Sequence, residues 1–156
     1  MKNWKKQLIA VICIIFMCSL PLIANYYSLK RNAKLLEANL AKLSETGQTE
    51  VTLEELAPFE WDKLYIFGAY FDVSEVYKTV GYNFGLAWKS GVTDEERQFV
   101  FMNGRKAVCY EYKAYDGHIV CKVDDSAGYS VIMRSKGLVF RVDRSGGGIK
   151  LYPIGK

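Results

Sequence analysis

Histidine is almost absent from this sequence, and its scarcity excludes several kinds of catalytic site. The 156 residues contain a single histidine, His118, which lies beside a predicted hairpin turn. A Ser-His-Asp triad needs a histidine base beside its nucleophile, and a two-histidine metal site needs a second imidazole. His118 is therefore interpreted as an exposed turn residue.

Other motifs that carry chemistry are also missing. The glycines at 146–148 are not accompanied by the Lys-Ser/Thr pair of a phosphate-binding loop. Asp124 and Asp125 lack the regularly spaced oxygen ligands of a calcium-binding loop. The sequence therefore predicts no catalytic residue, no metal site and no cofactor.

Cysteine is scarce as well, which limits the possible disulfides. Two of the four cysteines lie in an apolar N-terminal segment, so only Cys109 and Cys121 remain for the rest of the chain. A predicted hairpin turn at 116–117 places Cys121 opposite Tyr112, three residues from Cys109 and therefore on the other face of the sheet. Because a disulfide needs Cα atoms within about 7 Å, we predict two free thiols unless a β-bulge shifts one strand.

Excess positive charge is confined to the start of the chain, although the whole sequence has a net charge of +4. Residues 1–44 hold seven basic residues and one acidic residue, whereas residues 45–156 hold fourteen basic and sixteen acidic residues. A nucleic-acid-binding domain needs a basic surface. The sequence therefore predicts no nucleic-acid partner.

Charge is also segregated within the later part of the chain. Residues 45–62 carry six acidic residues and no basic one, whereas residues 126–156 carry six basic residues and one acidic one. We interpret both segments as solvated strand faces. The alternative is a basic edge directed at anionic lipid or at an acidic partner.

One long apolar run is present, and it dominates the organisation of the chain. Residues Gln7 to Ala24 contain no acidic or basic side chain. A helix needs roughly 17 to 25 such residues to cross a bilayer core of about 30 Å. The sequence therefore predicts an N-terminal transmembrane helix, with the lipid bilayer as the partner of residues 7–24.

The flanks of this run predict its orientation less directly. Basic residues flank both ends in similar number, so the lack of a second apolar run and the character of the C-terminal part favour a cytoplasmic N-terminus. We expect a single-pass protein of the cytoplasmic membrane whose C-terminal domain is extracytoplasmic. The alternative is a cleaved signal peptide, but cleavage after Ala24 would place the bulky Leu22 where a small residue is needed, which favours a retained anchor.

A second helical pattern follows the apolar run. Apolar residues recur in heptad spacing at Leu29, Ala33, Leu36, Leu40 and Leu43. We divide the chain into an anchor at 1–25, a helical stalk or linker at 26–50 and a domain at 51–156. The heptad stripe has two interpretations, a seam between chains or a stripe that packs on its own domain.

The domain at 51–156 reads as α+β. Capping boxes at Thr52–Glu55 and Asp72–Glu75 predict two short helices, and Trp61–Phe67 reads as a strand that is apolar on both sides. Hairpin signals follow at 103–104, 116–117 and 136–137. The fold class predicted is α+β, with an N-terminal transmembrane helix and then two short helices packed on one face of an antiparallel meander sheet.

The hairpin signals also predict a register. A two-residue loop at 103–104 places Phe99 opposite Val108, which puts Phe99, Val108 and Tyr110 on one face. The loop at 136–137 pairs residues 129–134 with residues 138–142. The sheet then contains about six strands in one meander.

The segment Phe59–Tyr70, FEWDKLYIFGAY, carries a family resemblance. It resembles a segment of small exported or membrane-anchored proteins of Gram-positive bacteria, in which a Trp-Asp strand ends in a Gly-Pro-Tyr turn; here Ala69 stands in place of the proline. That family has no established activity, so the resemblance implies a fold and a location only. The layout is also similar to the modules of the β-lactamase inhibitory protein and of small outer-membrane assembly lipoproteins.

We expect the domain to bind a protein partner without catalysis, because tyrosine and tryptophan are enriched at interfaces. The candidate binding residues are Trp61, Asp62, Tyr70, Tyr82 and Trp88. Three alternatives remain open: an immunity or inhibitor protein directed against an exported toxin, a hydrolase that uses Asp62, and a subunit of an envelope complex that associates through the 29–43 stripe.

Overall fold

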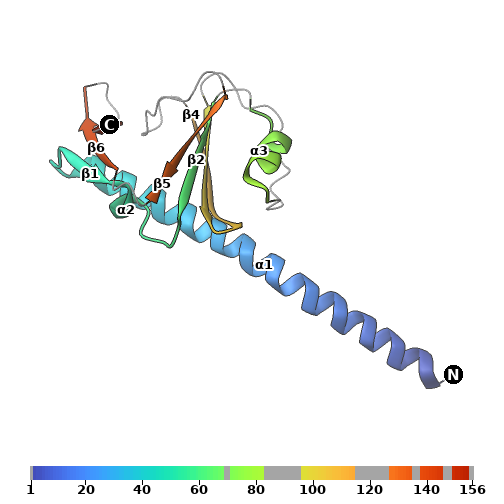
Figure 1. Ribbon diagram of the computed structural model, residues 1–156. Coiled ribbons are helices and arrows are strands. Elements are labelled where there is room, and N and C mark those ends of the chain that lie inside the picture. The colour runs from blue at the N-terminus through green and yellow to red at the C-terminus, as the bar shows by residue number, and fades with distance from the viewer. Residues whose placement is uncertain are drawn as a thin grey trace.

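A computed structural model describes residues 2–68, 71–82, 96–114, 127–134, 138–145 and 149–154. These residues form a long N-terminal helix and an α+β domain with antiparallel sheets (Figure 1). The elements, in chain order, are α1 (Lys2–Glu45), β1 (Glu50–Thr52), α2 (Leu53–Leu56), β2 (Lys63–Phe67), α3 (Val73–Val80), β3 (Glu96–Asn103), β4 (Lys106–Ala114), β5 (Tyr129–Met133), β6 (Val139–Asp143) and β7 (Lys150–Ile154).

Helix α1 has two halves with different surroundings. The first half projects away from the domain, and its large apolar side chains are exposed on every side of the helix (Figure 1). The second half lies along the domain, where Leu29, Leu36 and Leu40 are each at most 3% exposed. The helix is continuous across the boundary predicted at residue 25. It is long and apolar enough to span a membrane by length and composition.

The heptad stripe packs on its own domain, which confirms one of its two interpretations. Leu36, Leu40 and Leu43 belong to one hydrophobic cluster with residues of β1, β6 and α2. Asn32 interrupts the stripe and donates its side-chain amide to the Val108 carbonyl at 2.8 Å. The stripe is therefore part of an intramolecular core.

The strands of the described residues form two antiparallel sheets, with the orders β4-β3-β2-β5 and β1-β6-β7. The predicted hairpin between residues 129–134 and 138–142 is wrong, because β5 pairs with β2 whereas β6 pairs with β1 and β7. β2 is internal to its sheet, with Leu64 and Ile66 fully buried, as its apolar pattern predicted. β5 and β6 therefore belong to different sheets.

The β3–β4 hairpin is present, but its register differs from the prediction. Asn103 pairs with Lys106, and a bulge then places Phe101 opposite Cys109 and Val100 opposite Tyr110. The predicted common face of Phe99 and Tyr110 is wrong, because the extra residue at the bulge reverses the alternation of side chains. Gly104 adopts φ +58° in the turn, a conformation that favours glycine.

The two short helices begin where their capping residues predicted. The Thr52 hydroxyl accepts the Glu55 amide at 3.2 Å while the Glu55 carboxylate accepts the Thr52 amide at 2.7 Å. The Asp72 carboxylate accepts the Ser74 amide at 2.7 Å. These contacts satisfy amides that have no partner within the first turn of a helix.

The packing of both short helices on one face is not confirmed. Leu53 and Leu56 of α2 belong to the cluster that contains Leu36, Leu40 and Leu43 of α1. Val76 of α3 belongs to a different cluster, together with Phe67 and Val100 on the four-stranded sheet. α2 and α3 therefore cover different parts of the core (Figure 1).

Candidate functional site

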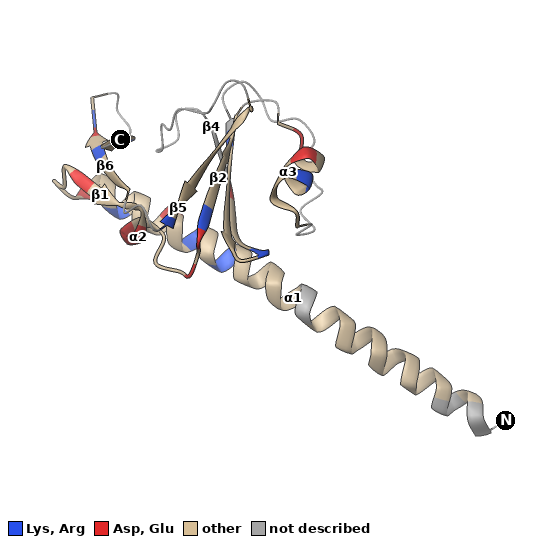
Figure 2. Cartoon of the chain, viewed as in Figure 1, with Lys and Arg blue, Asp and Glu red and all other residues tan. Residues whose placement is uncertain are grey.

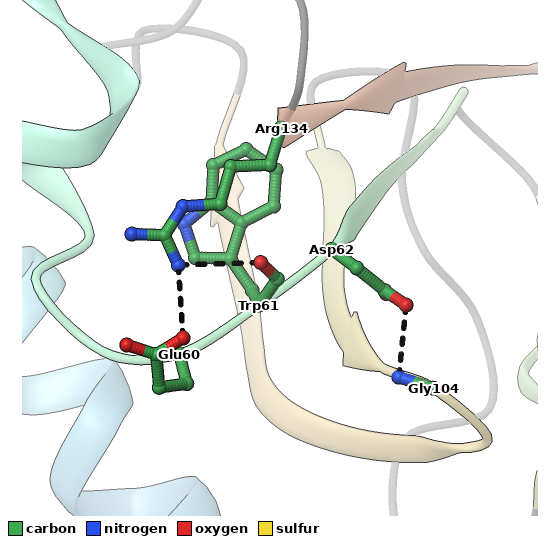
Figure 3. Close-up of polar contacts among 5 residues, drawn as sticks. All are labelled: Glu60, Trp61, Asp62, Gly104 and Arg134. Carbon is green, nitrogen blue, oxygen red and sulfur yellow. Dashed lines mark hydrogen bonds and ion pairs between the residues drawn. The ribbon is translucent and has the colours of Figure 1, made fainter.

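The candidate residues Trp61 and Asp62 lie in the bend that leads into β2. The bend is fixed by backbone hydrogen bonds on both sides, from the Asp62 amide to the Met102 carbonyl at 2.8 Å and from the Arg134 amide to the Asp62 carbonyl at 3.0 Å. Figure 3 shows this corner with Glu60, Gly104 and Arg134. The bend therefore joins three strands of the four-stranded sheet, β2, β3 and β5.

Asp62 has a structural role at this corner. One carboxylate oxygen, Oδ2, accepts the Gly104 amide at 3.0 Å, which fixes the turn between β3 and β4 (Figure 3). The other, Oδ1, is buried and makes no hydrogen bond within the part of the chain that the structure describes. The Asp62 carboxylate therefore gives the Gly104 amide, which lies in the turn, a hydrogen-bond acceptor.

The Asp62→Ala variant should lose about 1.5 to 3 kcal/mol of unfolding free energy, because a hydrogen bond to a charged acceptor disappears and the Gly104 amide loses its partner. Asp62→Asn should lose less, since an amide oxygen can still accept this hydrogen bond. Urea denaturation of the three proteins, followed by tryptophan fluorescence, measures the difference. Equal stability of all three would contradict the structural role of Asp62.

Trp61 is a core residue that lies beside Arg134. Its side chain is 3% exposed, and its ring meets Phe101 edge to face with centroids 5.5 Å apart. The Arg134 guanidinium lies 5.6 Å from the ring centroid and donates to the Trp61 carbonyl at 3.3 Å (Figure 3). Trp61 is therefore buried between the sheet and Arg134.

The acidic and basic segments of the sequence meet at the surface of the domain. Glu60 and Arg134 form an ion pair at 3.4 Å. Glu50 of β1 lies opposite Arg141 of β6 in the pairing of the small sheet. An ion pair at this exposure contributes little stability. The acidic and basic segments are therefore adjacent, so these two basic residues do not form a separate basic edge.

Arg144 was missed as a structural residue by the sequence reading. Its guanidinium donates to the carbonyls of Leu43 at 3.0 Å and Thr46 at 2.7 Å. These carbonyls lie at the C-terminus of α1, where backbone acceptors lack helical partners and the helix dipole favours a cation. Only the three-dimensional contact reveals this role, because about a hundred residues separate the two segments.

The remaining candidate binding residues do not join this corner. Tyr82 is partly buried and packs against the cluster that contains Phe67 and Val100. Tyr70 and Trp88 lie outside the described residues. The structure therefore brings together Trp61 and Asp62 and places Tyr82 elsewhere.

Ionisation is shifted at three described groups. Burial raises the pKa of the Cys109 thiol, with a further contribution from the negative charges of Glu111 and Glu37, so the thiol stays protonated. Cys109 is a free cysteine, as predicted, whereas Cys121 lies outside the described residues. Hydrogen bonds from Ser74 and from Ser145 lower the pKa values of the Asp72 and Asp143 carboxyls. None of these shifts creates a paired acid and base.

A hollow between α1 and α2 has a volume of about 160 Å³. Small-molecule sites usually measure about 300 to 1,000 Å³. Its lining is mostly polar or partly exposed, with Asn39, Lys42, Gln48 and Glu55 among the residues. Within the described residues no group of three or more His, Cys, Asp or Glu side chains could hold a metal ion.

No protein-family model matches the chain, and no curated protein or solved structure is detectably similar to it. The resemblance of Phe59–Tyr70 to the Gram-positive proteins thus stays a prediction. What the chain does must be argued from its own contacts, exposure and charge.

Proposed function

We propose that the chain is a single-pass protein of the cytoplasmic membrane that presents its α+β domain on the extracytoplasmic side. The domain acts as an accessory module that binds another protein and carries no catalysis. The observation that carries this proposal is the long helix, which is exposed and apolar in its first half and built into the domain in its second half.

The aromatic residues of α1 support its insertion. Trp4 and Tyr26 are 61% and 47% exposed, and aromatic side chains favour the two interfaces of a bilayer. At 1.5 Å per residue they are about 33 Å apart along the helix, close to the hydrocarbon thickness of about 30 Å. Large exposed side chains between them, such as Ile12 and Phe16, suit lipid rather than water.

Strand β5 supports the binding role. It is the last strand of the four-stranded sheet and pairs, among the described residues, on one side with β2. Val131 and Met133 of this strand are 45% and 37% exposed. An edge strand with exposed apolar side chains can accept a strand from another protein, with backbone hydrogen bonds giving affinity and side chains giving specificity.

The bend at Trp61 and Asp62 argues against the hydrolase alternative. Asp62 is committed to the Gly104 amide, and the Glu60 carboxylate is paired with Arg134. A hydrolase that uses two carboxylates needs one as acid and one as base, each facing the substrate. A domain that only binds a partner needs no such pair of carboxylates.

One experiment tests topology and binding together. The full chain is expressed with a photoreactive phenylalanine analogue at Val131 and with a reporter enzyme after Lys156 that is active only outside the cytoplasm. The matched control carries the analogue at Ile154, which is 41% exposed on the other sheet. We expect reporter activity from both chains and a discrete protein crosslink from position 131 only. A reporter active only in the cytosol contradicts the topology, and equal crosslinking at both positions contradicts the binding role of β5.

A further inference from the structure

Three basic side chains lie on α1 six to ten residues beyond the end of the apolar run at Ala24. Lys30, Arg31 and Lys34 are all exposed. They lie about 9 to 15 Å beyond Ala24 along the helix at 1.5 Å per residue. Headgroups extend roughly 5 to 8 Å beyond the hydrocarbon on each side of a bilayer, and long basic side chains reach back toward them. When the apolar half is inserted, these side chains therefore lie within about one Debye length of the lipid phosphates.

The turn between β3 and β4 is directed toward the same end of the domain. Along β4, Ala107 shares a cluster with Leu29, and the Val108 carbonyl accepts a hydrogen bond from Asn32. The negative charge of Glu37 contributes to the raised pKa of Cys109. Successive residues of β4 thus meet successively later residues of α1. The residues just before Ala107 must therefore lie toward the apolar half of the helix.

Those preceding residues are Arg105 and Lys106, and both are exposed. Figure 2 shows blue segments at this turn and on the second half of α1, where the β3–β4 pair meets the helix. The turn is held in place because the Gly104 amide donates to the Asp62 carboxylate at 3.0 Å. The two segments, about seventy residues apart in sequence, present their charges on one end of the domain.

We propose that this basic collar, defined as Lys30, Arg31, Lys34, Arg105 and Lys106, binds the anionic phospholipid headgroups of the bilayer that holds α1. The proposal rests on the membrane insertion of α1 proposed above. The helix and the turn then contact the membrane at two separate places. Two attachments restrict how far the domain can tilt over the surface, and so hold β5 at a constant orientation.

Charge elsewhere on the domain does not serve the same purpose. Arg134 is paired with Glu60, and Arg144 donates to the end of α1. Lys42 is twelve residues beyond Lys30, which is about 18 Å further along the helix. Surface attraction declines within a Debye length of about 8 Å at physiological salt, so Lys42 lies too far away to contribute.

The test uses the full chain reconstituted in vesicles of phosphatidylcholine, with or without phosphatidylglycerol. Hydrogen exchange of the 98–110 segment is measured by mass spectrometry, and co-flotation with the vesicles reports insertion. The test variant is Arg105→Gln with Lys106→Gln. The matched control is Arg141→Gln with Lys150→Gln, which removes the same charge from exposed positions on the other sheet.

We expect phosphatidylglycerol to slow exchange in the wild-type chain and in the control. The slowing should disappear in the Arg105/Lys106 variant. Each basic side chain that is removed should lower the equilibrium constant for contact between the turn and the membrane by roughly fivefold. The slowing should also disappear near 1 M salt, where the Debye length is about 3 Å. If the wild-type chain floats but phosphatidylglycerol does not change its exchange, the collar proposal alone is overturned. The same holds if the slowing persists in the Arg105/Lys106 variant. A chain that fails to float with either vesicle overturns the insertion itself.

Discussion

The Leu36→Ala variant should lose about 2 to 5 kcal/mol of unfolding free energy, the usual cost of removing a buried leucine side chain. Leu36 is 1% exposed and belongs to the cluster that joins α1 to β1, α2 and the small sheet. The loss combines the transfer of the side chain with the cavity that remains. Urea denaturation in mild detergent, followed by tryptophan fluorescence, measures it.

The adjacent residue provides the matched control. Leu35 lies on the same helix turn but is 40% exposed, so Leu35→Ala should change the unfolding free energy by less than about 1 kcal/mol. If both variants lost the same stability, the helix would not be built into the domain. If Leu36→Ala instead dissociated an oligomer and left the domain folded, the heptad stripe would be a seam between chains after all.

The sequence predicted α1 well because its signals are local. The apolar run and the heptad spacing each depend on residues within a few turns of one another, and the run is followed without a break by the stripe. The choice between a seam and an intramolecular stripe depended on a distant partner. That partner, the Val108 carbonyl bound by Asn32, is seventy-six residues away.

Strand order was much less predictable than the strands themselves. Short turn signals favoured a hairpin between residues 129–134 and 138–142. β5 instead pairs with β2, and the Arg134 amide just after β5 donates to the Asp62 carbonyl. A bulge in β4 also reversed the face of Tyr110 relative to Phe99. Both errors have one physical cause, since tertiary pairing and burial override the preferences of a short turn.

The candidate site also divides into features that are local in the sequence and features that depend on distant residues. The sequence singled out Trp61 and Asp62 because an aromatic and a carboxylate lie beside an apolar strand, and the structure places both at one corner. Their partners, Gly104 and Arg134, come from two other parts of the chain. The roles of Trp61 and Asp62 follow from those partners, so they could not be read from the segment alone.

The Trp61→Ala variant should lose about 3 to 5 kcal/mol of unfolding free energy, the range for truncating a buried aromatic residue. Trp61 is 3% exposed, so the change leaves a large cavity beside Phe101. It also removes the edge-to-face contact and the aromatic surface beneath Arg134, which contribute roughly 0.5 to 1.5 kcal/mol each. Thermal and urea denaturation of the reconstituted chain measure the loss.

Trp61→Phe is the control that separates packing from polarity. The indole Nε1 is buried and makes no hydrogen bond to any residue that the structure describes, so its removal costs no hydrogen bond there. The phenyl ring keeps contact with Phe101, and the loss should stay below about 2 kcal/mol because only part of the volume is removed. A Trp61→Ala protein as stable as the wild type, with altered crosslinking at β5, would instead make Trp61 a binding residue. Equal losses in both variants would mean that the indole nitrogen, rather than packing, holds this corner together.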